Sequence, residues 1–356
     1  MIYITFLAGL CFLLVGAEML VRGASRLAAR LGISPLVIGL TVVAFGTSSP
    51  ELAVSIKASL ADQAGIAMGN VVGSNIFNVL FILGLSAMVT PLVVAQQLIR
   101  FDIPLMVALS AALLLLVLDG QLSRLDGLLL AAGLVAYIAF LLYQNARSRL
   151  DTTAESDSTP PASNAWVVNL VLVVAGLALL VLGSRWLVEG AVTFASYLGV
   201  SEQVIGLTII AAGTSLPEVM TSLIAALRGE RDIAVGNVVG SNVFNILGVL
   251  GVSSLIASSG ITVPPAMISF DIPVMLAVAV ACLPICFTGG VIQRWEGALL
   301  LGYYIAYTLY LILATTQHDA LAGFTGVMLY FVLPLTLLTL AILSLQELKR
   351  RSGRVV

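Results

Sequence analysis

A succession of long apolar segments is the feature that most constrains this chain. A transmembrane helix needs roughly 20 apolar residues, and eleven segments of the sequence reach that length. Hydrophobic residues make up 60% of the chain and charged residues only 10%, too little charge to keep a soluble domain in solution. The sequence therefore predicts an all-α polytopic membrane protein. The expected spans are residues 2–21, 36–59, 66–89, 102–119, 125–144, 166–187, 202–227, 233–257, 270–289, 295–315 and 324–346.

The basic residues predict how the chain enters the membrane, because lysine and arginine concentrate in cytoplasmic loops. With the N-terminus outside, only Lys57, Arg124 and Arg185 of the 16 basic residues face outward. An even number of spans would place either the arginine-rich first loop or the basic C-terminal tail on the outer side. We therefore expect a multi-pass protein of the cell (inner) membrane, with its N-terminus outside and its C-terminus in the cytoplasm.

The composition also limits the partners. The net charge is −2, and no basic cluster with interleaved aromatic residues occurs, so nothing indicates nucleic-acid binding. Cys11, Cys282 and Cys286 fall within expected spans, and the single histidine, His318, lies in a different segment. This pattern argues against a disulfide framework or a soft-metal site. The expected partners are the lipid bilayer and whatever crosses it, and the oligomeric state is left open.

An internal repeat predicts the topology. The stretch "SPLVIGLTVVAFGTSSPE" at 34–51 aligns with "SEQVIGLTIIAAGTSLPE" at 201–218. In the same register, "AMGNVVGSNIFNVLFILG" at 67–84 aligns with "AVGNVVGSNVFNILGVLG" at 234–251. Five expected helices separate equivalent points, and because five is odd, the second copy should enter the membrane upside down. Such inverted repeats are typical of secondary transporters, whose site lies near the midplane between the two halves.

The repeat divides the chain into two halves and two smaller parts. We expect two inverted five-helix repeats, ten helices in all, with an eleventh helix near the C-terminus. The stretch between the halves is rich in Ser, Thr, Asp and Pro, which indicates a flexible linker. The expected parts are a first repeat at 1–144 with its motif at 34–84, a cytoplasmic linker at 145–165, a second repeat at 166–316 with its motif at 201–251, and an extra helix with a basic tail at 317–356.

Each copy carries a proline that should break its helix at membrane depth. Pro50 and Pro217 have no N–H, so the carbonyls of Gly46 and Gly213 lose their intrahelical donors. Loosened backbone is tolerated in a bilayer only where it is buried in protein or faces a polar cavity. We expect these carbonyls to lie beside oxygen-bearing side chains, where a hard cation could bind.

The side chains around these prolines are rich in oxygen. Thr47, Ser48 and Glu51 share one helix face by their spacing, and an intramembrane glutamate without a basic partner is by default a functional-site hypothesis. Oxygen ligands without Cys or His select Ca²⁺, Mg²⁺, Na⁺ or K⁺ over transition metals. The candidate residues are Thr47, Ser48, Glu51, Ser74 and Asn78 in the first copy and Thr214, Ser215, Glu218, Ser241 and Asn245 in the second.

Other polar residues in the spans have more than one reading from the sequence alone. Asparagines 70, 75, 237 and 242 could contribute oxygen ligands or hydrogen-bond a broken neighbouring helix. Asp102 and Asp271 each begin an expected span in "FDIP", where a carboxylate before proline suits a helix N-terminus, and a role in ion entry is the weaker alternative.

At these motifs the chain resembles the sodium/calcium exchanger family of the cation/calcium antiporter superfamily, in its prokaryotic type. The family's two alpha-repeats carry G-[ST]-S-x-P-E and G-N-x-x-G-S-N-x-x-[ND], and both patterns occur twice here, within about residues 1–316. The resemblance implies a Ca²⁺ site between Glu51 and Glu218, completed by oxygens of Thr47 and Thr214. It implies flanking Na⁺ sites from Ser48, Ser74, Ser215, Ser241 and the carbonyls of Ala44 and Ala211.

The resemblance also implies a mechanism. Helices one and six would slide across the rest, and Na⁺ and Ca²⁺ would occupy the shared glutamates in turn. Some relatives carry an aspartate at one of the positions that match Asn78 and Asn245, and the potassium-dependent branch resembles that arrangement. Both are asparagine here, so we expect K⁺-independent exchange of Na⁺ for Ca²⁺, with transported ions and no cofactor.

Three alternatives differ in what they require. A Ca²⁺/H⁺ antiporter of the same superfamily could also use two carboxylates, but its relatives tend to place glutamate where Asn78 and Asn245 stand. An ion channel would suit broken helices, although an enclosed, doubly acidic site binds too tightly for fast conduction. An intramembrane protease needs a Ser/His pair or facing aspartates, which the spans lack, so we do not expect an enzyme. The role of the eleventh segment does not follow from the sequence.

Overall fold

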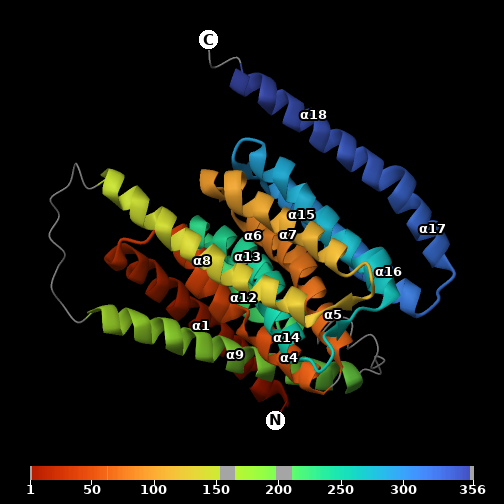
Figure 1. Ribbon diagram of the computed structural model, residues 1–356, viewed down its shortest axis with the longest axis horizontal. Coiled ribbons are helices and arrows are strands. Elements are labelled where there is room, and N and C mark those ends of the chain that lie inside the picture. Colours follow the sequence, from red (N-terminus) through yellow and green to blue (C-terminus); the bar gives the residue numbers. More distant parts are fainter. Residues whose placement is uncertain (1, 62, 153–164, 198–210, 353–356) are drawn as a thin grey trace.

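The protein is almost wholly helical in the computed structural model, which describes residues 2–61, 63–152, 165–197 and 211–352 (Figure 1). Nine helices of this described part are long and apolar enough to cross a membrane. A further helix pair, Pro35–Thr47 and Ser49–Leu60, passes the same test together and is bent by 44°. The predicted all-α membrane class is therefore confirmed. The nine helices cover Thr5–Leu31, Gly65–Val89, Leu98–Leu116, Arg124–Arg147, Trp166–Phe194, Arg231–Ile256, Met267–Phe287, Arg294–Thr315 and Ala320–Arg350.

The first half begins with one long helix and continues with a broken one. Its π-helical segments, labelled η, interrupt otherwise regular helices, as π-bulges often do at functional sites. The chain continues past residue 144, the expected end of the repeat, in an unbroken helix. The elements are α1 (Ile2–Leu31), α2 (Pro35–Ile38), η1 (Gly39–Val43), α3 (Ala44–Thr47), α4 (Ser49–Leu60), α5 (Ala64–Phe77), η2 (Asn78–Leu83), α6 (Gly84–Val89), β1 (Leu92–Val93), η3 (Leu98–Asp102), α7 (Ile103–Leu116), β2 (Gln121–Leu122) and α8 (Arg124–Thr152).

The second half repeats this order. Residues 198–210 lie outside the described part, and with them the expected seventh span before Ala211 and the start of the second motif copy. The extra segment forms a helix, as expected. The elements are α9 (Ala165–Tyr197), α11 (Ala211–Gly213), α12 (Leu216–Leu227), α13 (Arg231–Phe244), η5 (Asn245–Leu250), α14 (Gly251–Ile256), β3 (Ile261–Thr262), η6 (Met267–Asp271), α15 (Ile272–Phe287), β4 (Val291–Ile292), α16 (Arg294–Thr315), α17 (Ala320–Val327), η7 (Met328–Val332) and α18 (Leu333–Ser352).

Two short strand pairs reveal how the halves are related. β1 follows the third helix of the first half and pairs antiparallel with β4, which precedes the last helix of the second half. β2 follows the fourth helix of the first half and pairs antiparallel with β3, which follows the third helix of the second half. Each strand therefore meets the strand from the non-equivalent loop of the other half, so equivalent loops of the two halves lie at opposite ends of the bundle. This is the arrangement that an inverted repeat requires.

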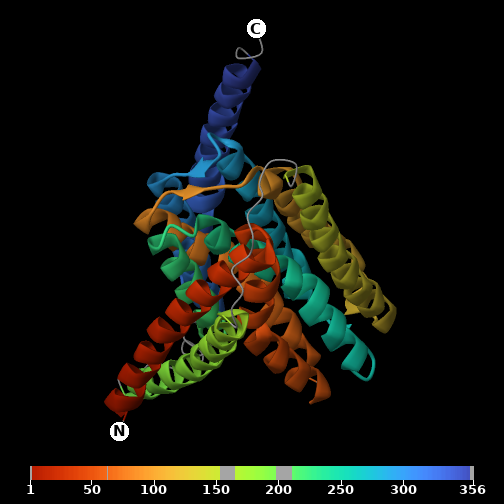
Figure 2. The ribbon, with the colours of Figure 1, turned by 90° about the vertical axis from the view of Figure 1, so that its left-hand side faces the viewer.

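The first helix of each half packs against the other, and glycines set the distance between them. α1 and α9 lie side by side in both views (Figures 1 and 2). A Cβ at Gly9 would lie 2.8 Å from the carbonyl of Gly183, and a Cβ at Gly176 would lie 2.7 Å from the carbonyl of Gly16. Small residues at such crossings allow backbones to approach closely within a bilayer. The two helices thus form a tightly packed pair.

The eleventh helix lies apart from the bundle along most of its length, at the right and top of Figure 1. The Tyr303 hydroxyl of α16 donates to the hydroxyl of Thr336 on α18 at 2.6 Å. Between the helices remains an apolar hollow of about 360 Å³, lined by α15, α16, α17, η7 and α18. The helix is therefore attached to the second half at the periphery, away from the repeated motifs.

The α1–α9 packing predicts a position-specific effect of added volume. Gly176→Ala should lower the free energy of unfolding by about 1–3 kcal/mol, because the new methyl overlaps the backbone of α1. The matched control is Gly302→Ala on α16, where a Cβ would meet nothing within 4 Å and alanine should only favour the helix. Thermal unfolding of both variants in detergent checks this, and equal melting temperatures would contradict the packing.

Candidate cation-binding site

The repeated motifs place a break in each of two helices. In the first half, Ser48 separates α3 from α4 with φ −81° and ψ 7°. In the second half, Thr214 and Ser215 separate α11 from α12, and Ser215 has φ −89° and ψ 8°. Pro50 and Pro217 lie in the first turn of the helix that follows, where a missing N–H is tolerated. The predicted breaks are therefore present in both copies with nearly the same backbone geometry.

The carbonyls freed by the prolines lie beside serine hydroxyls, and each accepts one hydrogen bond. The Ser49 hydroxyl donates to the carbonyl of Gly46 at 2.7 Å. The carbonyl of Gly213 accepts instead from the hydroxyl of Ser184 on α9, at 2.6 Å. A polar group that leaves water must find a hydrogen-bond partner, and a serine supplies one in each half. The two serines come from different places because the residue equivalent to Ser49 is Leu216, which has no hydroxyl.

Each glutamate is bound to the other half of the molecule. The Ser48 hydroxyl donates to Glu218 Oε1 at 3.0 Å, and the Ser215 hydroxyl donates to Glu51 Oε1 at 2.9 Å. Both carboxyl groups are buried, with 0% and 1% of each residue exposed. Within the described part of the chain, Glu51 Oε2 and Glu218 Oε2 have no hydrogen-bond partner. The repeat thus brings the two carboxyl groups into one crossed, nearly symmetric cluster.

Basic residues do not neutralise this cluster in the described ranges. The ion pairs found there are those of Glu18 with Arg22 and Arg228, and of Glu347 with Arg350. No group of three or more His, Cys, Asp or Glu side chains forms there either. Two buried carboxylates without a basic partner are strongly unfavourable unless a bound cation or a proton neutralises them. Charge balance then allows one divalent or two monovalent cations.

The threonines and the first asparagine of each motif connect the broken helices. The Thr47 hydroxyl lies 3.0 Å from Asn237 Oδ1, and the Thr214 hydroxyl lies 3.5 Å from Asn70 Oδ1. Asn70 Nδ2 donates to the backbone carbonyl of Glu51 at 3.0 Å. Asn237 makes the equivalent contact with Glu218 at 3.5 Å. Asparagines 70 and 237 therefore hold the helix breaks, one of the two roles that the sequence allowed.

The third helix of each half contributes further oxygens. The Ser74 hydroxyl lies 3.2 Å from the hydroxyl of Ser215, which donates its proton to Glu51, so Ser74 also lies beside this carboxyl group. Asn78 and Asn245 each begin a π-helical segment, η2 and η5. In the described part, three more oxygens of this region are buried without a hydrogen-bond partner: Asn78 Oδ1, Asn245 Oδ1 and Ser241 Oγ. Buried oxygens are normally hydrogen-bonded, so a cluster of unpartnered ones is suited to bind a cation.

The two alanines predicted to offer carbonyls are less informative. The carbonyl of Ala44 accepts the N–H of Ser48 at 3.0 Å and lies 3.4 Å from the Thr47 hydroxyl. The single Thr47 proton has nearer acceptors in the carbonyl of Val43 at 3.1 Å and in Asn237 Oδ1 at 3.0 Å, so one of the two lone pairs of the Ala44 carbonyl stays open. Ala211 is the first residue of α11 and borders the undescribed range.

The aspartates of the two "FDIP" motifs stand at the N-termini of α7 and α15, as expected, but their side chains make no capping hydrogen bond. Asp102 is fully buried, and its carboxylate accepts from the Tyr137 hydroxyl at 2.9 Å and from Gln97 at 3.3 Å. Asp271 accepts from the Tyr307 hydroxyl at 2.9 Å. Sequence reasoning missed these pairs, although a tyrosine follows each aspartate at a similar distance along the chain.

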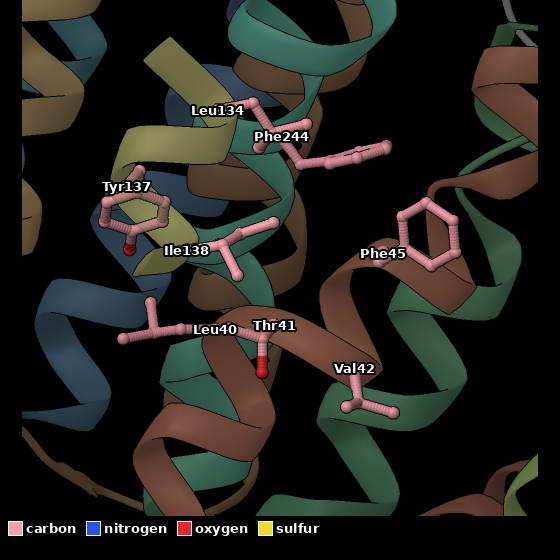
Figure 3. A pocket seen from close by; sticks show the side chains of 9 residues that line it. Leu40, Thr41, Val42, Phe45, Leu134, Tyr137, Ile138 and Phe244 are labelled. Atoms are coloured by element: carbon pink, nitrogen blue, oxygen red, sulfur yellow. The ribbon is translucent and has the colours of Figure 1, made fainter. Parts of the chain in front are cut away.

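One hollow lies near the first broken helix without offering a polar site. It has a volume of about 210 Å³, and residues of α8, α13 and the broken helix surround it (Figure 3). Its two polar side chains are already engaged, since Thr41 donates to the carbonyl of Val37 and Tyr137 donates to Asp102. The walls are otherwise apolar: Leu40, Val42, Phe45, Leu134, Ile138, Gly240 and Phe244.

Known proteins resemble this chain both in sequence and in fold. The family model described as "Sodium/calcium exchanger protein" matches residues 1–144 and 168–313. Inner membrane protein YrbG of Escherichia coli is 39% identical over 306 residues, covering 85% of this chain and 94% of that protein. Sodium/calcium exchanger MaX1 of Methanosarcina acetivorans is 34% identical over 340 residues, covering 86% and 97%. A solved structure of the sodium-calcium exchanger NCX_Mj aligns with a TM-score of 0.73 at 33% identity, covering 85% and 95%.

The serine that accompanies each freed carbonyl can be tested separately from the glutamates. Ser184→Ala should lower the free energy of unfolding by about 1–3 kcal/mol, because the buried carbonyl of Gly213 then lacks its donor. Ser86→Ala is the matched control, since the buried hydroxyl of Ser86 has no partner in the described chain. Thermal unfolding should separate the two variants, and an unchanged melting temperature of Ser184→Ala would count against the contact.

Proposed function

Because the chain belongs to the sodium/calcium exchanger protein family, we propose that it exchanges Na⁺ for Ca²⁺ across the membrane by alternating access. Members of this family are exchangers, so the activity is cation/Ca²⁺ antiport and not catalysis. The observation that carries the proposal is the pair of buried glutamates, each bound by a serine of the opposite half and each left with one unpartnered oxygen.

We assign the ligands from the side chains that gather around this pair. Ca²⁺ would bind between Glu51 and Glu218, with oxygens of Thr47 and Thr214 completing its shell, since Ca²⁺ takes six to eight oxygen ligands. Asn78 and Asn245 would add amide oxygens. The flanking Na⁺ sites would use Ser48, Ser74, Ser215, Ser241 and the carbonyls of Ala44 and Ala211.

Charge balance gives the coupling. Two carboxylates compensate one Ca²⁺ or two Na⁺, so the same glutamates serve both ions in turn and never together. A third Na⁺ would leave the occupied site net positive, and the cycle would then be electrogenic. Asn78 and Asn245 add no charge, which favours exchange without K⁺.

The helix arrangement supports a moving and a fixed part. α1 and α9 form a tightly packed pair, while the broken helices and the strand pairs connect the two halves directly. Sliding of the α1–α9 pair would open the site to alternate sides. We further propose the topology given by the basic residues: an inner-membrane protein with the N-terminus outside and the C-terminus in the cytoplasm, whose halves are 1–144 and 166–316, with 145–165 as a cytoplasmic linker.

The rival function is Ca²⁺/H⁺ antiport at the same site. Two carboxylates could carry protons in place of Na⁺. The neutral hydroxyl and amide oxygens around them favour Na⁺, however, because a proton on a carboxyl group needs no further ligands, whereas Na⁺ needs a shell of oxygens.

Removing either charge should stop exchange. Glu51→Gln and Glu218→Gln keep the size of the side chain but halve the negative charge of the site, so each should reduce Na⁺-driven ⁴⁵Ca²⁺ uptake by about 100-fold or more. Glu18→Gln is the control, because Glu18 pairs with arginines at a partly exposed position. Retained uptake in Glu218→Gln would refute the shared site.

The coupling ion can be identified with inverted vesicles. Vesicles loaded with Na⁺ should take up ⁴⁵Ca²⁺ when diluted into Na⁺-free medium, and should do so without K⁺ on either side. A pH gradient alone should drive no uptake. Uptake that follows only the pH gradient would replace the proposed function by Ca²⁺/H⁺ antiport, and uptake that requires K⁺ would refute K⁺ independence.

A further inference from the structure

Four asparagines cross between the third helices of the two halves, at the point where each helix becomes a π-helix. We call Asn75, Asn78, Asn242 and Asn245 the amide tetrad. All four are buried, with 1–2% of each residue exposed. We propose that Asn75 and Asn242 are positioning residues that make Asn245 and Asn78 present oxygen, and not NH₂, to the transported cation. This inference rests on the proposed function and assigns to these two residues the control of the ligand atoms.

The contacts of the tetrad form two series of hydrogen bonds. Each series begins at a backbone carbonyl and passes through two side-chain amides. Asn242 Nδ2 donates to the backbone carbonyl of Asn75 at 3.3 Å. Asn242 Oδ1 then accepts from Asn78 Nδ2 at 2.9 Å. In the other chain, Asn75 Nδ2 donates to the carbonyl of Asn242 at 3.3 Å, and Asn75 Oδ1 accepts from Asn245 Nδ2 at 3.1 Å.

The direction of each chain is fixed at its first atom. A side-chain amide can turn over and exchange its oxygen and nitrogen with almost no change in shape, so its orientation depends on its partners. A backbone carbonyl can only accept, so it requires Nδ2 of Asn242 on its side. Asn242 Oδ1 must then face Asn78, and Asn78 must meet that oxygen with Nδ2. The Oδ1 of Asn78 is left pointing away from the tetrad.

The tetrad leaves two amide oxygens without a hydrogen-bond donor, and oxygen is the kind of ligand that a hard cation needs. Asn78 Oδ1 and Asn245 Oδ1 are both buried and have no partner in the described part of the chain. Asn78 lies one helical turn from Ser74, which contacts Ser215 beside Glu51. A second contact supports the orientation of Asn242, whose Nδ2 lies 3.4 Å from Met106 Sδ on α7, a weak acceptor.

Without the tetrad the amides would compete with the cation. A freed Asn78 could turn its Nδ2 toward the carboxylates and donate to one of them, a charge-assisted hydrogen bond that stabilises the wrong orientation. Cation binding would then have to reverse the amide, and the apparent affinity would fall with the fraction of molecules in the correct orientation.

A double-mutant cycle separates positioning from mere packing. Asn242→Leu, close in shape, removes the acceptor of Asn78 and should weaken equilibrium ⁴⁵Ca²⁺ binding to the purified protein by about tenfold or more. Asn78→Asp presents oxygen in either orientation. In that background, Asn242→Leu should weaken binding by less than about threefold, because there is no amide left to misorient.

Controls cover folding and the proposed function. Ser110→Ala removes a buried hydroxyl on α7 that donates to the carbonyl of Met106 in the same helix and should leave the affinity unchanged. If Asn242→Leu does not fold, Asn242→Ser replaces it in the cycle, since the smaller side chain admits water, which does not fix the orientation of an amide. Equal losses in the wild-type and Asn78→Asp backgrounds, or an unchanged affinity in Asn242→Leu, overturn the positioning role. A wild-type chain that binds no ⁴⁵Ca²⁺ refutes the proposed function instead.

Discussion

The structure depends on two like charges held together in an interior of low polarity. Glu51 and Glu218 are both buried, and each is bound by a serine from the opposite broken helix. Two carboxylates repel one another and lose their hydration there, so the arrangement is stable only when a bound cation or a proton neutralises them. The helix breaks, the crossed hydroxyls and the asparagines that anchor the breaks all serve to keep these two groups at one place.

The two halves satisfy equivalent backbone and side-chain groups with partly different residues. The breaks at Ser48 and Ser215 and the amide tetrad follow the repeat closely. The freed carbonyls do not, since one accepts from the next serine in its own helix and the other from Ser184 on α9. An inverted duplication therefore fixes which atoms face the site more strictly than it fixes how the backbone behind the site is satisfied.

The sequence alone predicted the helical membrane class, the breaks and the residues that gather at the site, because all of these depend on local composition and on a repeat visible in one dimension. It could not predict that Gly213 is hydrogen-bonded by Ser184 or that Asp102 meets Tyr137, because those contacts join separate spans. The roles of asparagines 75 and 242 were left open for the same reason. An amide is equally suited to donate or accept, and only the backbone carbonyl that it faces decides between them.

The small strands have a consequence for movement. β1–β4 and β2–β3 tie loops of one half to loops of the other through main-chain hydrogen bonds at opposite ends of the bundle. Neither strand pair includes a residue of α1 or α9. A rearrangement that separated the halves as whole bodies would have to break the main-chain hydrogen bonds of one strand pair. A displacement of the α1–α9 pair would break the hydrogen bonds of neither strand pair. The strand pairs therefore hold the two halves together at both ends of the bundle and leave the α1–α9 pair outside that connection.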